Sequence, residues 1–235
     1  KYLSYALSTT KAKIQKSKGK VKSKVVHSSV PDIGKIVIPI PPLPVQNEIV
    51  RILDNFAELT AELTAELTAR KKQYEYYRNE LLLANGNKKQ LLLGDIGRVA
   101  MCKRIMKSET SKEGDVPFFK IGTFGKEPDA YITQEKFEEY RLNYSFPKKG
   151  AVLISAAGTI GRTVIYDGLP AYYQDSNIVW LENDESIVLN KYLFYYYQLQ
   201  PWAVSTGGTI ARLYNDNIVK AKIEVPAIQE QERIV

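Results

Sequence analysis

Residues 46–84 read QNEIVRILDNFAELTAELTAELTARKKQYEYYRNELLLA and contain neither glycine nor proline. Apolar and aromatic residues recur at steps of three or four, with one step of seven, which is the spacing that lines one face of a helix. Three prolines precede the stretch and Asn85-Gly86-Asn87 follows it, so the pattern predicts a single long helix. The recurring positions are Ile49, Ile52, Phe56, Leu59, Leu63, Leu67, Tyr74, Tyr77 and Leu81.

The apolar seam of this helix is defined by Phe56, Leu59, Leu63, Leu67, Tyr74, Tyr77 and Leu81. At about 1.5 Å per residue the helix would be about 58 Å long, so the seam is expected to need a partner helix. An ordinary core helix is the alternative. The tetrapeptide AELT occurs three times in succession from Ala57 to Thr68, and each unit adds about 6 Å of length and about 40° of rotation. The tandem inserts a stutter into a heptad-like pattern, which is typical of an adjustable spacer.

Composition limits the classes of function. A hydrophobic fraction of 44% supports a proper core, and no apolar run approaches the roughly 18 residues of a membrane span. The single cysteine, Cys102, cannot form an internal disulfide, fits a reducing cytoplasm, and is expected to be a buried small hydrophobe. One histidine, His27, cannot build a His-based metal site, so metal and nucleophilic catalysis are disfavoured.

Positive charge is concentrated at the start of the chain. The net charge is +7, and residues 1–35 carry nine lysines and one aspartate, so this segment alone contributes +8. Lysines fall at nearly every second position of residues 11–24, and a strand or extended loop would point them to one side. A solvated loop is one interpretation. Contact with a phosphate backbone through Lys13, Lys16, Lys18 and Lys20 is the other.

An internal repeat links the two ends of the sequence. Lys1-Tyr2-Leu3 matches Lys191-Tyr192-Leu193, at a separation of 190 residues. KIVIPIPPLPVQNEIV, which begins at Lys35, matches KAKIEVPAIQEQERIV at a separation of 185 residues. We therefore expect both ends to be cut from a larger pattern, in which a globular domain is followed by a long helix twice.

The remaining residues indicate an α+β fold. Helices are expected at residues 1–9, 135–143 and 190–202, and a short strand at residues 35–40. Residues 91–107 and 116–125 are expected to form turn-rich strands. In residues 148–183, β-branched and aromatic runs are separated by glycine turns, which predicts several short strands.

These stretches resemble the specificity subunit of type I restriction–modification systems, close to the IC group. The resemblance rests on IPIPPLPVQNEIVRILDNF, the AELT tandem, ARKKQYEYYRNELL and the second copy IEVPAIQEQERIV. It implies a remnant of a first target recognition domain in residues 1–45 and a spacer helix in residues 46–86. A target recognition domain would follow in residues 87–225, and the start of a second spacer helix in residues 226–235. The two spacer helices would pair as an antiparallel coiled coil.

The resemblance also implies a function. The chain would be a non-catalytic subunit that reads half of a split target in double-stranded DNA. Modification subunits would methylate adenine with S-adenosylmethionine, and motor-nuclease subunits would cut unmodified DNA. S-adenosylmethionine, ATP and Mg are therefore expected on those partners, with no cofactor and no metal on this chain. Self-dimerisation through residues 46–84 would supply a second half-site.

Several polar stretches are candidates for DNA contact. AAGTIG, residues 156–161, lacks the Lys-Ser/Thr of a phosphate loop, so we expect a glycine turn that presents its flanking polar residues. Arginine pairs with guanine edges or phosphates and glutamine with adenine edges, although a surface turn and core tyrosines are the alternatives. The candidates beyond the lysine run are Lys103, Arg104, Ser155, Thr159, Arg162, Tyr173, Gln174, Thr206 and Arg212.

Two rival classes of protein fit parts of the sequence. A coiled-coil adaptor whose globular domain binds protein would explain the long helix. An autonomous methyltransferase is disfavoured, since the sequence has no Asp/Asn-Pro-Pro-aromatic tetrapeptide for a flipped adenine.

Overall fold

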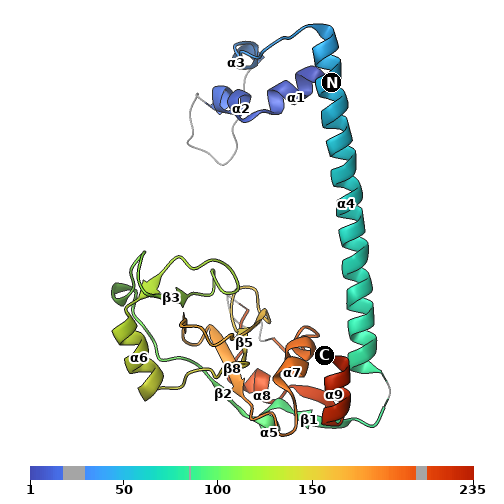
Figure 1. Ribbon diagram of the computed structural model, residues 1–235. Helices are drawn as coiled ribbons and strands as arrows, with labels where there is room; N and C mark the ends of the chain where they lie inside the picture. Colours follow the sequence, from blue (N-terminus) through green and yellow to red (C-terminus); the bar gives the residue numbers. More distant parts are fainter. Residues whose placement is uncertain (18–29, 85, 205–210) are drawn as a thin grey trace. The chain divides into compact units, whose positions relative to one another are not determined.

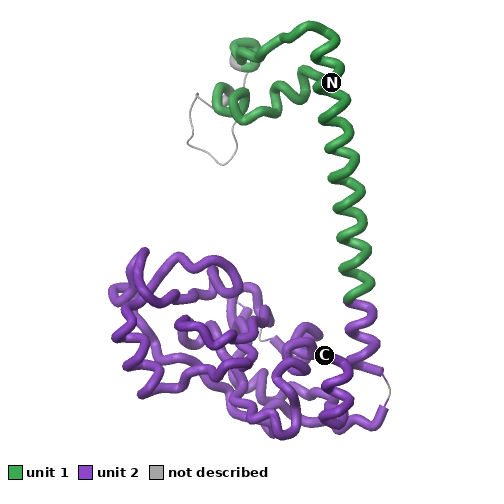
Figure 2. The backbone as a smooth tube through the Cα atoms, viewed as in Figure 1, with its two compact units in different colours: residues 1–74 green, residues 75–235 purple. Residues whose placement is uncertain are grey.

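The computed structural model describes residues 1–17, 30–84, 86–204 and 211–235 (Figure 1). The chain divides into two compact units, residues 1–74 and residues 75–235 (Figure 2). We describe each unit by itself.

The long helix, α4, runs from Leu43 to Leu83 and has 41 residues. It begins earlier than expected because Pro44 lies in its first turn, where the missing proline N–H is not needed. Each AELT threonine donates its hydroxyl to the carbonyl four residues earlier, as Thr64 does to Thr60 at 2.7 Å. Although α4 is long, no helix in the described parts of the chain has the length and apolarity to cross a membrane.

The apolar seam of α4 is exposed. Leu63, in the middle of the AELT tandem, is 65% exposed, and the other seam residues are exposed as well. Burial within α4 is confined to Leu82. The alternative of an ordinary core helix is therefore wrong for this stretch, and the seam is left for a partner.

Unit 1 contains three short helices before α4: α1 (Tyr2–Ser8), α2 (Thr10–Ser17) and α3 (Val30–Gly34). The prediction of a helix at residues 1–9 is confirmed. The first part of the lysine run is neither a strand nor an extended loop, since α2 carries Lys11, Lys13 and Lys16 on a helix. Residues two apart on a helix differ by about 200°, so Lys11 and Lys13 do not share one side. The strand expected at residues 35–40 is absent as well, because no neighbouring strand in the described residues pairs with it.

Unit 2 mixes short strands and helices, which confirms the α+β class. The prediction of a helix near residues 135–143 is confirmed, as are the strands broken by glycine turns in residues 148–183. The elements are β1 (Lys89–Leu92), α5 (Leu93–Ile96), β2 (Arg98–Ala100), η1 (Lys107–Glu109), β3 (Val116–Phe119), β4 (Tyr131–Ile132), α6 (Gln134–Asn143), β5 (Val152–Ser155), β6 (Thr163–Ile165), β7 (Tyr172–Tyr173), β8 (Ile178–Glu182), α7 (Asn190–Tyr197), α8 (Asn215–Val219), β9 (Lys222–Val225) and α9 (Ile228–Ile234).

Three small sheets organise unit 2. The largest has the order β2-β8-β5-β6 with antiparallel neighbours, the second has the order β4-β3-β7, and the third is the antiparallel pair β1 and β9. Successive residues of β5 face opposite sides. Val152 and Ile154 join the hydrophobic cluster that includes α7, whereas Leu153 joins the cluster that includes Trp180 and Phe137. In Figure 1, α6 lies at one end of unit 2 and α7, α8 and α9 at the other.

The internal repeat recurs in the hydrogen bonds of the two copies. The Tyr2 hydroxyl donates to the Pro39 carbonyl at 2.9 Å, and the matching Tyr192 hydroxyl donates to the Glu224 carbonyl at 2.8 Å. Gln46 donates from Nε2 to the carbonyl of Pro41 at 2.7 Å. In the second copy Gln231 makes the same bond to Pro226, at 2.8 Å.

One hydrogen bond of the second copy is missing from the first, and the two sequences explain why. In the second copy the Tyr196 hydroxyl accepts the Glu224 N–H at 3.1 Å. The first copy has Ala6 in place of the tyrosine and Pro39 in place of the glutamate. It therefore lacks the donor and the acceptor together, so no unpaired group is left behind.

Candidate nucleic-acid interface

A groove of about 690 Å³ opens on unit 2 between the segment around η1 and the loop that joins β7 to β8. Its lining carries four cationic side chains and two acidic ones, so the groove is positive on balance. We call it the polar groove. It is lined by Arg104, Ile105, Met106, Lys107, Thr110, Ser111, Lys112, Phe118, Lys120, Asp129, Ala130, Gln174, Asp175, Ser176 and Asn177.

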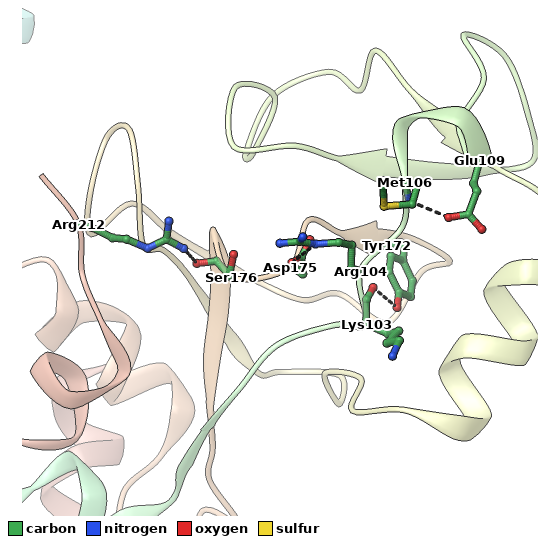
Figure 3. A network of polar contacts seen from close by, with 8 residues as sticks. All are labelled: Lys103, Arg104, Met106, Glu109, Tyr172, Asp175, Ser176 and Arg212. Atoms are coloured by element: carbon green, nitrogen blue, oxygen red, sulfur yellow. Dashed lines mark hydrogen bonds and ion pairs between the residues drawn. The ribbon is translucent and has the colours of Figure 1, made fainter. Parts of the chain in front are cut away.

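Two arginines hold the β7–β8 loop, residues 174–177, from two sides (Figure 3). Arg104 donates from Nε to Asp175 Oδ2 at 2.9 Å, and Arg212 donates from Nη2 to the Ser176 carbonyl at 2.7 Å. Ser176 has φ 53°, a left-handed conformation that costs a serine of order 1–3 kcal/mol. The two arginine contacts restrain this conformation, so the loop is presented in one arrangement.

Gln174 makes hydrogen bonds within unit 2 through both its side chain and its backbone. Its side-chain oxygen accepts the Ile121 N–H at 2.9 Å, and its backbone N–H donates to the Phe119 carbonyl at 2.9 Å. Reading adenine with both amide atoms needs that oxygen as an acceptor. The oxygen keeps a second lone pair and the amide nitrogen keeps its hydrogens, so the contact of Gln174 with DNA stays a prediction.

The glycine turn of residues 156–161 forms as expected, with φ 65° at Gly158 and 79° at Gly161. Ser155 is 1% exposed, donates its hydroxyl to the Thr159 carbonyl and accepts the Arg162 N–H at 2.8 Å. The hydroxyl of Ser155 thus closes the turn from inside, and its contact with DNA stays a prediction that this burial does not favour.

Arg162 is half-buried and donates from Nη1 to the Phe124 carbonyl at 2.7 Å. That donor ties two segments of unit 2 together, so the arginine is not wholly available to a guanine edge. Thr159 is exposed at the tip of the turn, so its contact with DNA stays a prediction.

Tyrosines near the groove belong to the core. Tyr173 is 6% exposed and stacks on Phe119 with ring centroids 5.7 Å apart, as the core alternative expects, and its contact with DNA stays a prediction. The buried Tyr172 donates its hydroxyl to the Lys103 carbonyl at 2.9 Å. Cys102 is buried as expected, and burial raises the pKa of its thiol to about 12.

The cationic candidates are distributed over different surfaces. Lys103 is exposed with its ammonium 4.9 Å from the Tyr144 ring centre, while Arg104 lines the polar groove. Lys13 is exposed on α2 in unit 1. The side chain of Lys16, and the whole of Lys18, Lys20 and Thr206, lie outside the described residues.

Three segments that are separate in the sequence meet beside the groove. Ala156 donates its N–H to the Asn177 carbonyl at 2.8 Å, and its own carbonyl accepts the Leu213 N–H at 2.9 Å. The glycine turn, the β7–β8 loop and the segment after residue 210 therefore share one edge of unit 2. The sequence prediction singled out all three segments without showing that they meet.

Sequence reasoning missed four residues of the groove: Lys107, Lys112, Lys120 and Asn177. The available signal was the continuation of basic residues from Lys103 to Lys112, and the position of Asn177 in the same polar run as Gln174. Within the residues described, no group of three or more His, Cys, Asp or Glu side chains is placed to hold a metal ion.

Comparison with known proteins gives one family. A family model described as the type I restriction modification DNA specificity domain matches residues 1–73 and 85–235. A Haemophilus influenzae protein named as a type I restriction enzyme specificity subunit is 56% identical over 225 residues, covering 92% of this chain and 58% of the relative. A type I restriction enzyme specificity subunit of Escherichia coli is 31% identical over 221 residues, covering 86% of this chain and 54% of the relative. The chain thus spans under two thirds of the length of these relatives.

The fold also matches a solved structure. That structure concerns complex assembly and conformational transition of the type I R-M system, and it superposes with a TM-score of 0.58 at 21% sequence identity. The match covers 99% of this chain and 60% of the other chain.

Proposed function

The chain belongs to the type I restriction modification DNA specificity family, and from this premise we propose that unit 2 reads one half of a bipartite DNA target. The polar groove is the observation that supports the proposal most directly. It combines exposed cations with a loop of hydrogen-bonding side chains that two arginines hold in place. Cations fix a protein on the phosphate backbone, and preorganised polar side chains read base edges.

The groove residues divide into two roles. Lys107 and Lys112 are exposed and would meet phosphates. The half-buried Lys120 is ion-paired with Asp129 at 2.7 Å. Asn177 is half-buried in the groove wall and carries the amide that pairs with adenine edges. Arg104 and Arg212 act by positioning the loop between them. In unit 1, the lysine run of residues 11–24 would add phosphate contacts.

Selection from a pool of random DNA duplexes tests this function. The chain, immobilised and washed at moderate salt, should enrich duplexes that share one short contiguous motif. Asn177→Ala should enrich a motif altered at one or two positions while total DNA retention stays nearly constant. Retention without any shared motif would contradict sequence reading by unit 2.

The chain is proposed to act without chemistry of its own. It would position modification and motor-nuclease subunits, which would carry S-adenosylmethionine, ATP and Mg. A solved relative concerns complex assembly in a type I system, which supports such partners. Methyl transfer from labelled S-adenosylmethionine by the isolated chain would contradict this part of the proposal.

The exposed seam of α4 supports a second helix as the partner of the spacer. Paired antiparallel, from a second copy or a second spacer, the two helices would set the gap between half-sites. Deleting one AELT unit removes about 6 Å of length and about 40° of rotation. One base pair of duplex corresponds to about 3.4 Å and roughly 34–36°. We expect the rotation, rather than the length, to decide the change in the gap. A recognition domain that is turned out of the DNA groove loses its base contacts.

Methylated sites made with partner subunits would therefore show a gap shorter by one base pair, with both half-sites unchanged. An unchanged gap, or altered half-site bases, would show that the tandem is not the ruler. The same exposed seam also favours a second candidate function, a coiled-coil adaptor whose globular domain binds protein. An adaptor would retain duplex DNA only at low salt, through its net charge of +7, and would enrich no shared motif.

A further inference from the structure

Arg104 differs from the other two arginines that were predicted to contact DNA in which of its nitrogens are occupied. Arg162 donates from Nη1 and Arg212 from Nη2, each to a backbone carbonyl at 2.7 Å. Arg104 instead donates from Nε to Asp175 Oδ2 at 2.9 Å. Across the described part of the chain, its terminal nitrogens Nη1 and Nη2 have no hydrogen-bond partner. The outer edge of this guanidinium is therefore unoccupied.

The backbone that carries Arg104 is anchored before and after it (Figure 3). The Lys103 carbonyl accepts the hydroxyl of a buried tyrosine at 2.9 Å. Ile105 is 8% exposed and packs in the hydrophobic core. The Met106 N–H then donates to Glu109 Oε2 at 2.7 Å. The arginine side chain thus leaves a backbone that is fixed on both sides.

Asp175, the partner of the Arg104 Nε, is held in place as well. Its side chain is 18% exposed, whereas that of Arg104 is 66% exposed. On one side of it the Gln174 N–H donates to a carbonyl of β3 at 2.9 Å, and on the other the Ser176 carbonyl accepts Arg212 at 2.7 Å. The carboxylate therefore fixes the guanidinium from its inner side. Because Arg104 lines the polar groove, its free edge can be reached from there.

The free edge carries parallel N–H groups, which match either the O6 and N7 acceptors of guanine or two oxygens of a phosphate. Charge favours the base. The Asp175 carboxylate offsets the positive charge of Arg104 and so weakens its attraction to a phosphate, but it leaves the direction of the N–H groups unchanged. The exposed Lys107 and Lys112 of the same groove supply charge for phosphates.

We propose that Arg104 reads a guanine through Nη1 and Nη2, and that Asp175 is the positioning residue that aligns it. The assignment rests on the proposed function, DNA reading by unit 2, and names one base of the target. The contact between the two side chains then has two roles, because it restrains the β7–β8 loop and orients the arginine.

A guanine analogue tests the assignment on the motif that selection from random duplexes returns. The motif should contain a guanine whose replacement by 7-deazaguanine, which keeps base pairing but lacks the N7 acceptor, weakens binding by the parent chain about tenfold. Arg104→Ala should bind the unmodified motif about tenfold more weakly and lose its sensitivity to the analogue. Its binding to random duplexes should stay nearly unchanged.

Two further variants separate orientation from charge and from folding. Arg104→Lys keeps the charge but cannot donate two parallel hydrogen bonds, so it should behave like Arg104→Ala. Asp175→Ala should weaken binding to the motif in the parent chain and cause no further loss in the Arg104→Ala background. A further loss in that background would overturn the positioning role of Asp175, and full binding by Arg104→Lys would overturn bidentate reading.

Arg98 provides the matched control. It also donates from Nε to a carboxylate, that of Glu182, and its side chain is 76% exposed, but it is not among the residues that line the polar groove. Arg98→Ala should keep both the affinity for the motif and the sensitivity to the analogue.

Three results would overturn the assignment of Arg104 while leaving DNA reading by unit 2 intact. They are a motif in which no guanine is sensitive to the analogue, an unchanged sensitivity in Arg104→Ala, and equal losses of Arg104→Ala on motif and random duplexes, which would indicate a phosphate contact. Enrichment of no shared motif would overturn the proposed function, and the assignment with it.

Discussion

The two copies of the repeat share their hydrogen bonds and differ in their burial. Tyr2 and Tyr192 bind the matching carbonyl at 2.9 and 2.8 Å, and Gln46 and Gln231 bind theirs at 2.7 and 2.8 Å. Leu3, however, is 57% exposed where Leu193 is 1% exposed. The local hydrogen bonds therefore form with or without a covering strand. Burial depends on a segment that the local sequence does not contain.

The largest difference between the copies is expected for their leucines. Leu193→Ala should lower the free energy of unfolding of unit 2 by about 4 kcal/mol, because it opens a cavity in a closed core. Leu3→Ala should change the stability around α1 by less than about 0.5 kcal/mol, since its side chain is already in water. Native-state hydrogen exchange of α7 and α1 measures the two effects separately. Equal losses would show that Leu3 is buried in solution.

Removing the buried glutamine should have the next largest effect. Gln231 is fully buried, accepts the Leu189 N–H at 2.8 Å and donates to the Ile187 and Pro226 carbonyls at 2.9 and 2.8 Å. Gln231→Ala leaves these groups unsatisfied and should cost about 2–3 kcal/mol.

Gln46 is half-buried and makes only the Pro41 bond of this set, so Gln46→Ala should cost well under about 1 kcal/mol. Trp180 and Trp202 both lie buried in unit 2, so urea unfolding followed by tryptophan fluorescence measures the Gln231→Ala effect. Hydrogen exchange at the start of α4 measures the effect of Gln46→Ala. A loss at Gln46 as large as that at Gln231 would mean that the first copy is covered like the second.

Tyrosine hydroxyls should give the smallest difference. Tyr192→Phe removes the donor to the Glu224 carbonyl inside unit 2 and should cost about 1 kcal/mol. In Tyr2→Phe, water can replace the missing hydroxyl at the exposed Pro39 carbonyl, so the cost should be near zero. Hydrogen exchange of α7 and α1 again separates the copies. Comparable costs would contradict the difference in solvent access.

Periodicity and turn residues were enough to predict much of the fold. The uninterrupted spacing of residues 46–84 predicted α4, and the β-branched runs between glycines predicted strands β5 to β8. The alternation of lysines in residues 11–24 was a poor guide to their conformation. Alternating side chains indicate a strand only where a neighbouring strand pairs with the segment. Whether residues 35–40 form a strand depends on a pairing partner elsewhere in the chain. The local sequence could not show that this partner is missing.

The sequence pointed to several residues at the polar groove but did not reveal the hydrogen bonds that they make with one another. Arg104, Gln174 and Arg212 were named as base or phosphate contacts, and the structure gathers them around one loop. That Gln174 binds Ile121 and that Arg212 binds Ser176 depends on residues 53 and 36 positions apart. Such distant pairings follow from the packing of the strands, so a single sequence could not reveal which side chains are already occupied.

Salt dependence of DNA binding tests the polar groove most directly. Lys107→Ala with Lys112→Ala should reduce the slope of log affinity against log salt by about 2, because removing one lysine–phosphate interaction reduces it by about 1. Lys148→Ala with Lys149→Ala is the matched control, since these exposed lysines are not among the residues that line the groove. We predict an unchanged slope for the control pair. Equal slopes for the groove pair and the parent chain would contradict DNA binding in the groove.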